Sequence, residues 1–142
     1  MKIKYYLRSI KHNDDIINAK LEQIENLRNS MCNITSDMSS ERVQTSNISD
    51  LSETVSNLID LQNELTCDVD NLVNLKRMII NEIDQLDNCD YKALLHLRYL
   101  NFKSWEEIAV IMGYSYRNVH YIHERALIAF ETLHTFAHNS MV

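Results

Sequence analysis

The sequence predicts an all-α protein, with a helical hairpin or coiled coil over residues 1–87 and a second helical domain over residues 88–142. Two observations support this prediction. The 142 residues include one glycine and no proline, the two residue types that most often end helices and form tight turns. Apolar residues also recur every seven positions along the N-terminal part, as they do in paired helices. We therefore expect long helices rather than many short strands.

The first predicted helix covers about residues 3–31. Its apolar residues follow a seven-residue spacing at Ile10, Ile17, Ile24 and Met31, with Leu21 and Leu27 on neighbouring tracks. The segment 32–48 that follows is rich in Ser, Thr and Asn and shows no apolar periodicity. We expect this segment to be a connecting loop.

The second predicted helix covers about residues 49–86 and has the clearest heptad pattern. Its seam consists of Leu51, Leu58, Leu65, Leu72, Ile79 and Leu86. A single helix cannot bury such a seam, and the first helix offers only about three heptads against about five. The pattern therefore allows an antiparallel hairpin within one chain, dimerisation of the longer helix, or both. We expect a homodimer that uses this seam.

Residues 88–142 contain signals for three further helices. The inner side of the first one carries Leu94, Leu97 and either Tyr99 or Leu100. Ser104 and Glu107 have the spacing of a capping box, in which side chain and backbone bond reciprocally at a helix start. Gly113 suits the left-handed conformation that ends a helix, and Ser115 suits the cap of the last helix.

Four residues have the spacing of a helix-turn-helix motif, namely Ala109, Gly113, Val119 and Ile122. The motif needs a small residue where the helices cross, a glycine in a turn too tight for a side chain, and two apolar anchors on the second helix. The last helix continues with Ala126 and Phe130 on the same inner side. We therefore expect a helix-turn-helix domain in this part of the chain.

The stretch LLHLRYLNFKSWEEIAVIMGYSYRNVHYIHERALIAF resembles region 4 of sigma-70-type factors. That pattern has a Thr/Ser-x-Glu-Glu-Ile-Ala helix start, a glycine turn, a recognition helix and a closing Ala-Leu pair, here Ala126 and Leu127. With the coiled coil in front, the chain is similar to small phage and prophage proteins related to the RinA/ArpU-type late transcriptional activators. The resemblance implies transcription regulation through promoter DNA, through the RNA polymerase of a bacterial host, or through both, and does not imply a complete sigma factor.

The resemblance also implies roles for individual residues. The recognition-helix residues that would enter the major groove are Tyr116, Arg117, Asn118, His120, Tyr121 and Glu124. The residues at helix starts that would contact phosphate are Ser104, Trp105 and Ser115. Region 4 of sigma factors usually carries several arginines on the groove face, whereas this chain has chiefly Arg117, with Arg125 further along.

The formal net charge of -6 is unevenly distributed, with +2 in residues 1–31, -8 in residues 32–87 and 0 in residues 88–142. An acidic segment repels phosphate, so we expect nucleic-acid contacts only near the two ends of the chain. No apolar run is long enough for a membrane span, and the N-terminus does not resemble a signal peptide. These features predict a cytoplasmic protein without a membrane partner.

Patterns of catalysis and metal binding are missing from the sequence. His120 with His123, and His134 with His138, have helical spacings that could hold a metal, but no Cys or carboxylate set completes either site. We therefore expect no enzyme, no metal and no cofactor. Two alternatives to a DNA-binding regulator are a protein that binds RNA polymerase without reading DNA and a small terminase-like packaging component. Small terminases generally have the reverse domain order, which argues against the last alternative.

Overall fold

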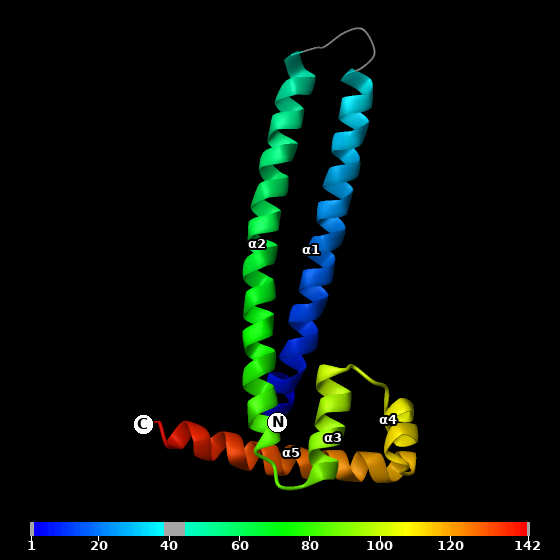
Figure 1. Cartoon of the computed structure of the whole chain (residues 1–142), viewed down its shortest axis with the longest axis vertical. Helices are drawn as coiled ribbons and strands as arrows, with labels where there is room; N and C mark the ends of the chain where they lie inside the picture. The colour runs from blue at the N-terminus through cyan, green and yellow to red at the C-terminus, as the bar shows by residue number, and fades with distance from the viewer. Residues whose placement is uncertain (1, 39–44, 142) are drawn as a thin grey trace. The chain divides into compact units, whose positions relative to one another are not determined.

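The computed structural model describes residues 2–38 and 45–141, and this part of the chain contains helices and short connections only (Figure 1). The elements are α1 (Lys2–Met38), α2 (Thr45–Asp84), α3 (Cys89–Leu95), a π-helical turn η1 (His96–Leu100), α4 (Trp105–Met112) and α5 (Tyr116–Asn139). The all-α prediction is confirmed for these residues. None of the helices described here combines the length and apolarity that crossing a membrane requires.

The two N-terminal helices extend beyond their predicted bounds. α1 ends at Met38 instead of about residue 31, and α2 begins at Thr45 instead of Ser49. Of the loop predicted over 32–48, residues 32–38 and 45–48 are helical, and 39–44 lie outside the described residues. Within this extension the Thr35 hydroxyl donates to the carbonyl of Met31, 2.9 Å away and one turn back, so its polar group is satisfied inside the helix. Polar residues that satisfy their hydroxyls in this way can continue a helix.

The chain divides into two compact units. Unit 1 contains Met1–His12 and Leu72–Val142, and unit 2 contains Asn13–Asn71. The two long helices each contribute to both units, so this division differs from the predicted boundary after residue 87. Heptad spacing alone could not locate the division, because the spacing continues through it on both helices.

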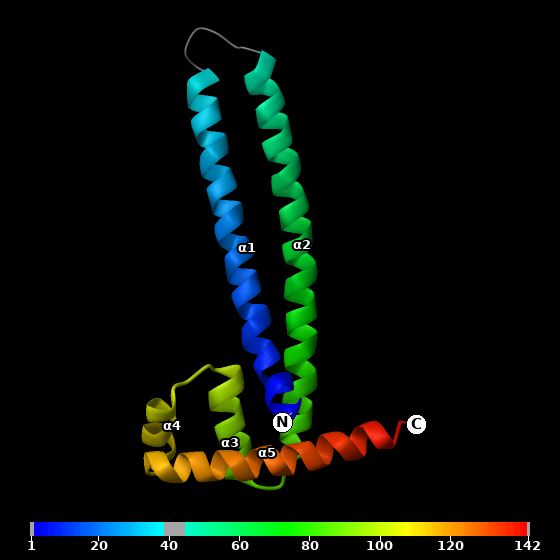
Figure 2. The same cartoon turned by 180° about the vertical axis from the view of Figure 1, so that it is seen from behind.

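Unit 2 is an antiparallel pair formed by the α1 and α2 segments, which run side by side in both views (Figures 1 and 2). Ile17 and Ile24 of α1 are buried in the seam between them. Lys20 also faces this seam, where it forms a hydrogen-bonded ion pair with Asp68 and lies 3.6 Å from Glu64. The hydrogen bond to Asp68 raises the pKa of Lys20, although burial opposes this effect.

The six predicted seam residues of α2 differ in burial. Leu72, Ile79 and Leu86 are buried inside unit 1, while Leu51, Leu58 and Leu65 are half-buried in unit 2. The argument for a coil dimer assumed a first helix too short to cover the seam, and that assumption is wrong, because α1 has 37 residues against 40 in α2. Pairing within one chain therefore accounts for much of the seam.

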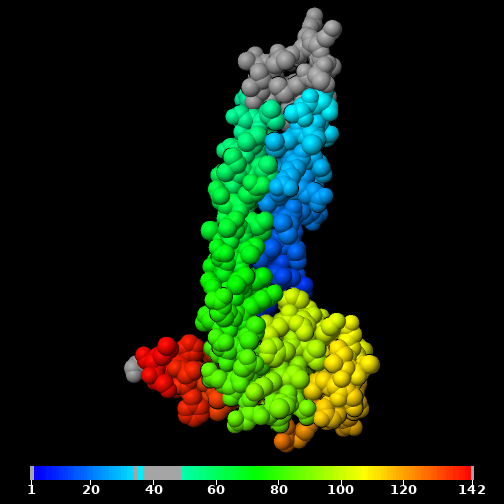
Figure 3. All heavy atoms as spheres, viewed as in Figure 1, coloured from blue at the N-terminus to red at the C-terminus, as the bar shows by residue number. Residues whose placement is uncertain are grey.

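Unit 1 has its own apolar core, to which every element contributes. Its completely buried side chains are Leu7, Ile10, Ile79, Ile83, Leu94, Leu95, Ile108, Val119, Ala126 and Phe130. α3 starts at the N-cap Asn88, whose side chain accepts hydrogen bonds from the backbone N–H groups of Asp90 and Tyr91. The space-filling view shows the last turns of α5, in red, beside the end of α2 (Figure 3).

Candidate nucleic-acid interface

α4 begins with the predicted capping box. The Ser104 hydroxyl accepts the N–H of Glu107 at 3.2 Å, and the Glu107 carboxylate accepts the N–H of Ser104 at 2.8 Å. The hydrogen bond from the Ser104 backbone is the main reason why the pKa of Glu107 is lowered. A carboxylate therefore already occupies this helix start, which disfavours the phosphate contact predicted for Ser104.

The turn between α4 and α5 depends on Gly113. Its φ of 71° lies in the left-handed region, and its N–H donates to the carbonyl of Ala109. A Cβ at this position would meet nothing within 4 Å, so the turn requires glycine for its backbone conformation rather than for space. Ser115 then caps α5 by accepting the N–H of Asn118 at 3.2 Å. In contrast to α4, α5 has no acidic residue in its first turn, so its start is open to an anion.

The turn is also fixed to α3. The Tyr114 hydroxyl donates to the Asp90 carboxylate at 2.8 Å, and this hydrogen bond is the main cause of the raised pKa of Tyr114. Asp90 lies in the first turn of α3, whose cap positions it. The relative placement of α3, α4 and α5 is therefore set by a polar contact as well as by the core.

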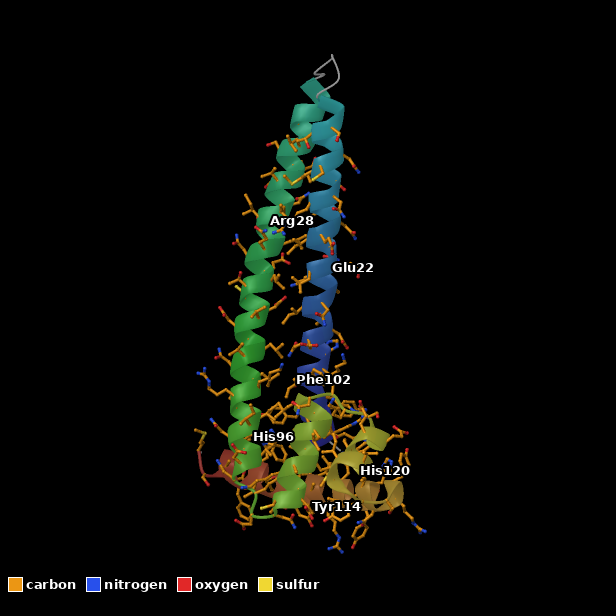
Figure 4. All side chains as sticks on the ribbon, turned by 45° about the vertical axis from the view of Figure 1, so that its right-hand side comes forward. Glu22, Arg28, His96, Phe102, Tyr114 and His120 are labelled. Atoms are coloured by element: carbon orange, nitrogen blue, oxygen red, sulfur yellow. The ribbon has the colours of Figure 1, made fainter. Side chains whose placement is uncertain are left out.

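The first turns of α5 have a buried side and an open side. Val119 is completely buried and Ile122 is 9% exposed, while Ala109 of α4 is half-buried. The open side carries Tyr116, Arg117, Tyr121 and Glu124, which are exposed, with Asn118 and His120 half-buried beside them. All six predicted groove residues are thus brought together on one helix end (Figure 4, around His120).

Trp105 lies at the centre of a cluster of rings beside this open side. The centroid of its ring is 4.6 Å from that of His120 and 4.7 Å from that of His123. The guanidinium of Arg98 lies 4.3 Å above the Trp105 ring and donates to the carbonyl of Lys103 at 2.9 Å. The Trp105 ring therefore contacts both Arg98 and His120, and the phosphate contact predicted at this helix start stays a prediction.

His123 is the buried member of this cluster, with 5% of its surface exposed. Its Nε2 shares a hydrogen bond of 2.8 Å with the Tyr99 hydroxyl. Burial lowers the pKa of His123 to about 4, and the positive charges of Lys4 and Arg98 act in the same direction. The imidazole is therefore neutral at pH 7, and basic side chains from α1 and η1 lie near enough to act on it.

Several basic residues near α5 were missed by the sequence analysis, above all Arg98, Lys4 and Arg8. The last two belong to α1, about a hundred residues from α5 in the chain, but to the same compact unit. Unit 1 contains eleven Lys and Arg against eight Asp and Glu, a net charge of +3, and unit 2 contains three against twelve, a net charge of -9. The excess of basic residues in the first 31 positions was the available signal.

Other predicted residues do not converge into a site. His134 and His138 are in ring contact at 4.4 Å, but no three His, Cys, Asp or Glu side chains in the described ranges gather as a metal site would require. Arg125 lies 4.7 Å from the centre of the Tyr121 ring, so it belongs to the edge of the open side. The open side of α5 and its supporting rings are therefore the candidate site.

Comparison with known proteins gives one family. No curated protein and no solved structure matches the chain. The model of the family described as "Protein of unknown function (DUF1492)" matches residues 33–131, which is more than half of the chain and includes the α4–α5 turn and the open side of α5. The chain therefore belongs to the DUF1492 family.

Proposed function

We propose that this protein is a phage-type transcription regulator that binds promoter DNA with the α4–α5 pair as a helix-turn-helix. The observation that carries this proposal is the geometry of the pair, with a capped α4, a left-handed glycine and a capped α5 whose first turns are open to solvent. In helix-turn-helix proteins, the N-terminal residues of the second helix contact base edges in the major groove. The resemblance of this stretch to region 4 of sigma factors points to the same function.

The side chains on the open side suit this function. Arg117 is exposed and can donate to guanine edges, and Asn118 can bond a base or a phosphate. The exposed rings of Tyr116 and Tyr121 add flat contact area and hydroxyl donors. Arg98 remains available as a cation because its contact with the Trp105 ring and its hydrogen bond to the carbonyl of Lys103 leave further N–H donors. The net charge of +3 on unit 1 favours phosphate over the whole unit.

The test is fluorescence anisotropy with labelled promoter fragments at two salt concentrations. If Arg117 reads a base, Arg117→Ala costs about 1 to 3 kcal/mol on the preferred sequence and removes discrimination at one position. If Arg117 meets only phosphate, binding weakens equally on all fragments and the salt slope falls by about one. The matched control is Arg77→Ala, because Arg77 is an exposed arginine of α2 in the same unit. Equal, weak binding of all fragments by wild type and both variants would refute DNA reading.

A second candidate is a protein that binds RNA polymerase, and one observation favours it. Val110 and Ile111 of α4 are 82% and 56% exposed, and they lie one turn after Glu106 and Glu107. Adjacent exposed apolar residues with an acidic rim suit a protein partner better than DNA. Capture of purified polymerase by wild type but not by Val110→Glu, without any DNA preference, would favour this candidate over DNA binding.

A further inference from the structure

The second half of α5 is held firmly on one side. The Tyr6 ring of α1 lies 4.9 Å from the His134 ring and 6.5 Å from the Phe130 ring, measured between centroids. On α2, Glu82 Oε1 lies 3.4 Å from His134 Nδ1. Burial, together with the neighbouring Glu82, raises the pKa of Tyr6 to about 12. These contacts fix the orientation of α5 beyond the candidate DNA-binding site.

The opposite side of this half is exposed and combines two large apolar side chains with small polar ones. We define the outer face of α5 as Ile128, Thr132, Thr135, Phe136 and Asn139. Ile128 is 57% exposed and Phe136 is 67% exposed. The hydroxyls of Thr132 and Thr135 donate to carbonyls of the same helix, at 2.9 Å and 2.8 Å. Both hydroxyls are therefore already hydrogen-bonded and can be buried at an interface. An open hollow of about 420 Å³ is lined by the outer-face residues from Thr132 onward together with Glu131.

The outer face is also nearly free of charge. From residue 126 to residue 142, Glu131 is the only Asp, Glu, Lys or Arg, although such residues make up 24% of the whole chain. A second copy of this face would therefore meet only one carboxylate, that of Glu131 at the edge of the hollow, and like-charge repulsion would be small. The exposed apolar residues of unit 2, such as Ile59, lie in a unit of net charge -9, which would repel its own copy. The low charge of the outer face, compared with the net charge of -9 on unit 2, thus favours the outer face of α5 as the surface for self-association.

We infer that the outer face of α5 packs against the same face of a second copy in an antiparallel, two-fold symmetric dimer. This inference deepens the proposed function and rests on it where DNA is concerned. A two-fold interface requires a self-complementary surface, and an uncharged face with an aromatic residue and a hollow beside it meets this requirement. Phe136 supplies the side chain that fills the partner's hollow.

The position of the outer face agrees with the repeat of DNA. Thr132, at its centre, follows His120 by twelve residues, which is about 18 Å along a helix. A two-fold axis at Thr132 would place the two reading ends about 36 Å apart, close to the 34–36 Å that separates successive major grooves on one side of B-DNA. Around the helix axis, the outer face lies about 70° from the centre of the exposed residues on the open side of α5. A partner helix beside α5 therefore leaves both reading ends open toward the same duplex.

The experiment measures the mass of the full chain without DNA, by light scattering and sedimentation equilibrium over the micromolar range. We expect a wild-type dimer, and we expect Thr132→Arg and Phe136→Glu each to weaken it by about tenfold or more, because an unpaired charge would be buried at the contact. The matched controls for Phe136→Glu are Val110→Glu and Ile59→Glu, which place the same negative charge on exposed apolar positions outside the face. Far-UV circular dichroism checks that all variants keep their helices.

The outcomes separate this inference from the proposed function. A wild-type monomer throughout the range, or a dimer that Ile59→Glu dissociates and Thr132→Arg does not, would overturn the α5 interface whatever the protein does with DNA. DNA reading is tested separately on a single half-site, which monomeric variants still bind if the proposed function is right. On fragments with two half-sites, wild type should prefer a spacing of about ten base pairs, and Thr132→Arg should lose that preference.

Discussion

Acidification should destabilise the protein through His123, because this histidine is buried in the folded chain and its pKa is lowered there. Its pKa is lowered from 6.5 to about 4 in the folded chain. Between these values the unfolded chain binds a proton that the folded chain does not bind. Stability is therefore full above pH 6.5, falls as the pH decreases, and loses nothing further from this group below about pH 4.

The size of the effect follows from the difference between the two pKa values. Each pKa unit corresponds to about 1.4 kcal/mol, so His123 alone should lower the free energy of unfolding by about 2 kcal/mol at pH 5 and about 3 kcal/mol at pH 4. Because its side chain is only 5% exposed, solvent screening should reduce this figure little. At pH 5, a loss of this size corresponds to a decrease in Tm of roughly 5 to 10 °C for a chain of this length.

The assay is urea unfolding, followed by circular dichroism, at several pH values between 7.5 and 5. The test variant is His123→Gln, which cannot titrate and keeps an amide as a partner for the Tyr99 hydroxyl. The control is His12→Gln, at an exposed position of the same unit. We expect the pH slope to disappear in His123→Gln and to persist in His12→Gln. Identical slopes in wild type and His123→Gln would refute a buried, neutral imidazole.

Three further predictions concern stability. Gly113→Val should cost about 1 to 3 kcal/mol in unfolding experiments, because the positive φ strains a β-branched residue, and Gly113→Asn should cost clearly less; equal costs would mean that φ is not the cause. Ser104→Ala should cost about 1 kcal/mol by loss of the cap, and this cost should change when Glu107→Ala has already removed the reciprocal hydrogen bond, as a double-mutant cycle would show. Leu72→Ala should cost about 2 to 5 kcal/mol and Leu65→Ala distinctly less, because Leu72 is 7% exposed and Leu65 is only half-buried; the reverse order would argue for a buried partner at Leu65.

The features that the sequence predicted most accurately are those that depend on residues close together in the chain. The capping box at Ser104 and the left-handed Gly113 are local, because each depends on a few residues and on backbone geometry. The end of α1 was misplaced because polar residues were interpreted as a loop, although the Ser30 hydroxyl, like that of Thr35, donates to a carbonyl one turn back. The Ser and Thr content of a segment does not show whether the side-chain hydroxyls bond to carbonyls of the same helix or compete with the helix for its backbone hydrogen bonds.

The site residues missed by the sequence analysis depend on tertiary contacts. Stacking of Arg98 on Trp105 joins η1 to α4, and the hydrogen bond between Tyr99 and His123 joins η1 to α5. No spacing rule relates these residues, because they lie on different elements. The sequence analysis considered His123 only as a possible metal ligand. The structure separates His123 from the other histidines, which are half-buried or exposed, by its burial, and burial cannot be deduced from the residue type.

The separation of charge between the two units makes the acidic chain compatible with the proposed DNA binding. Judged by its net charge of -6, the whole protein would be repelled by phosphate. Unit 1 alone has a net charge of +3, however, because it includes the basic start of α1 as well as the C-terminal helices. Charges interact appreciably only within a Debye length, about 8 Å at physiological ionic strength. The net charge of -9 on unit 2 would therefore oppose the proposed DNA binding only where its side chains came that close to the duplex, and the charges of unit 1 would dominate elsewhere.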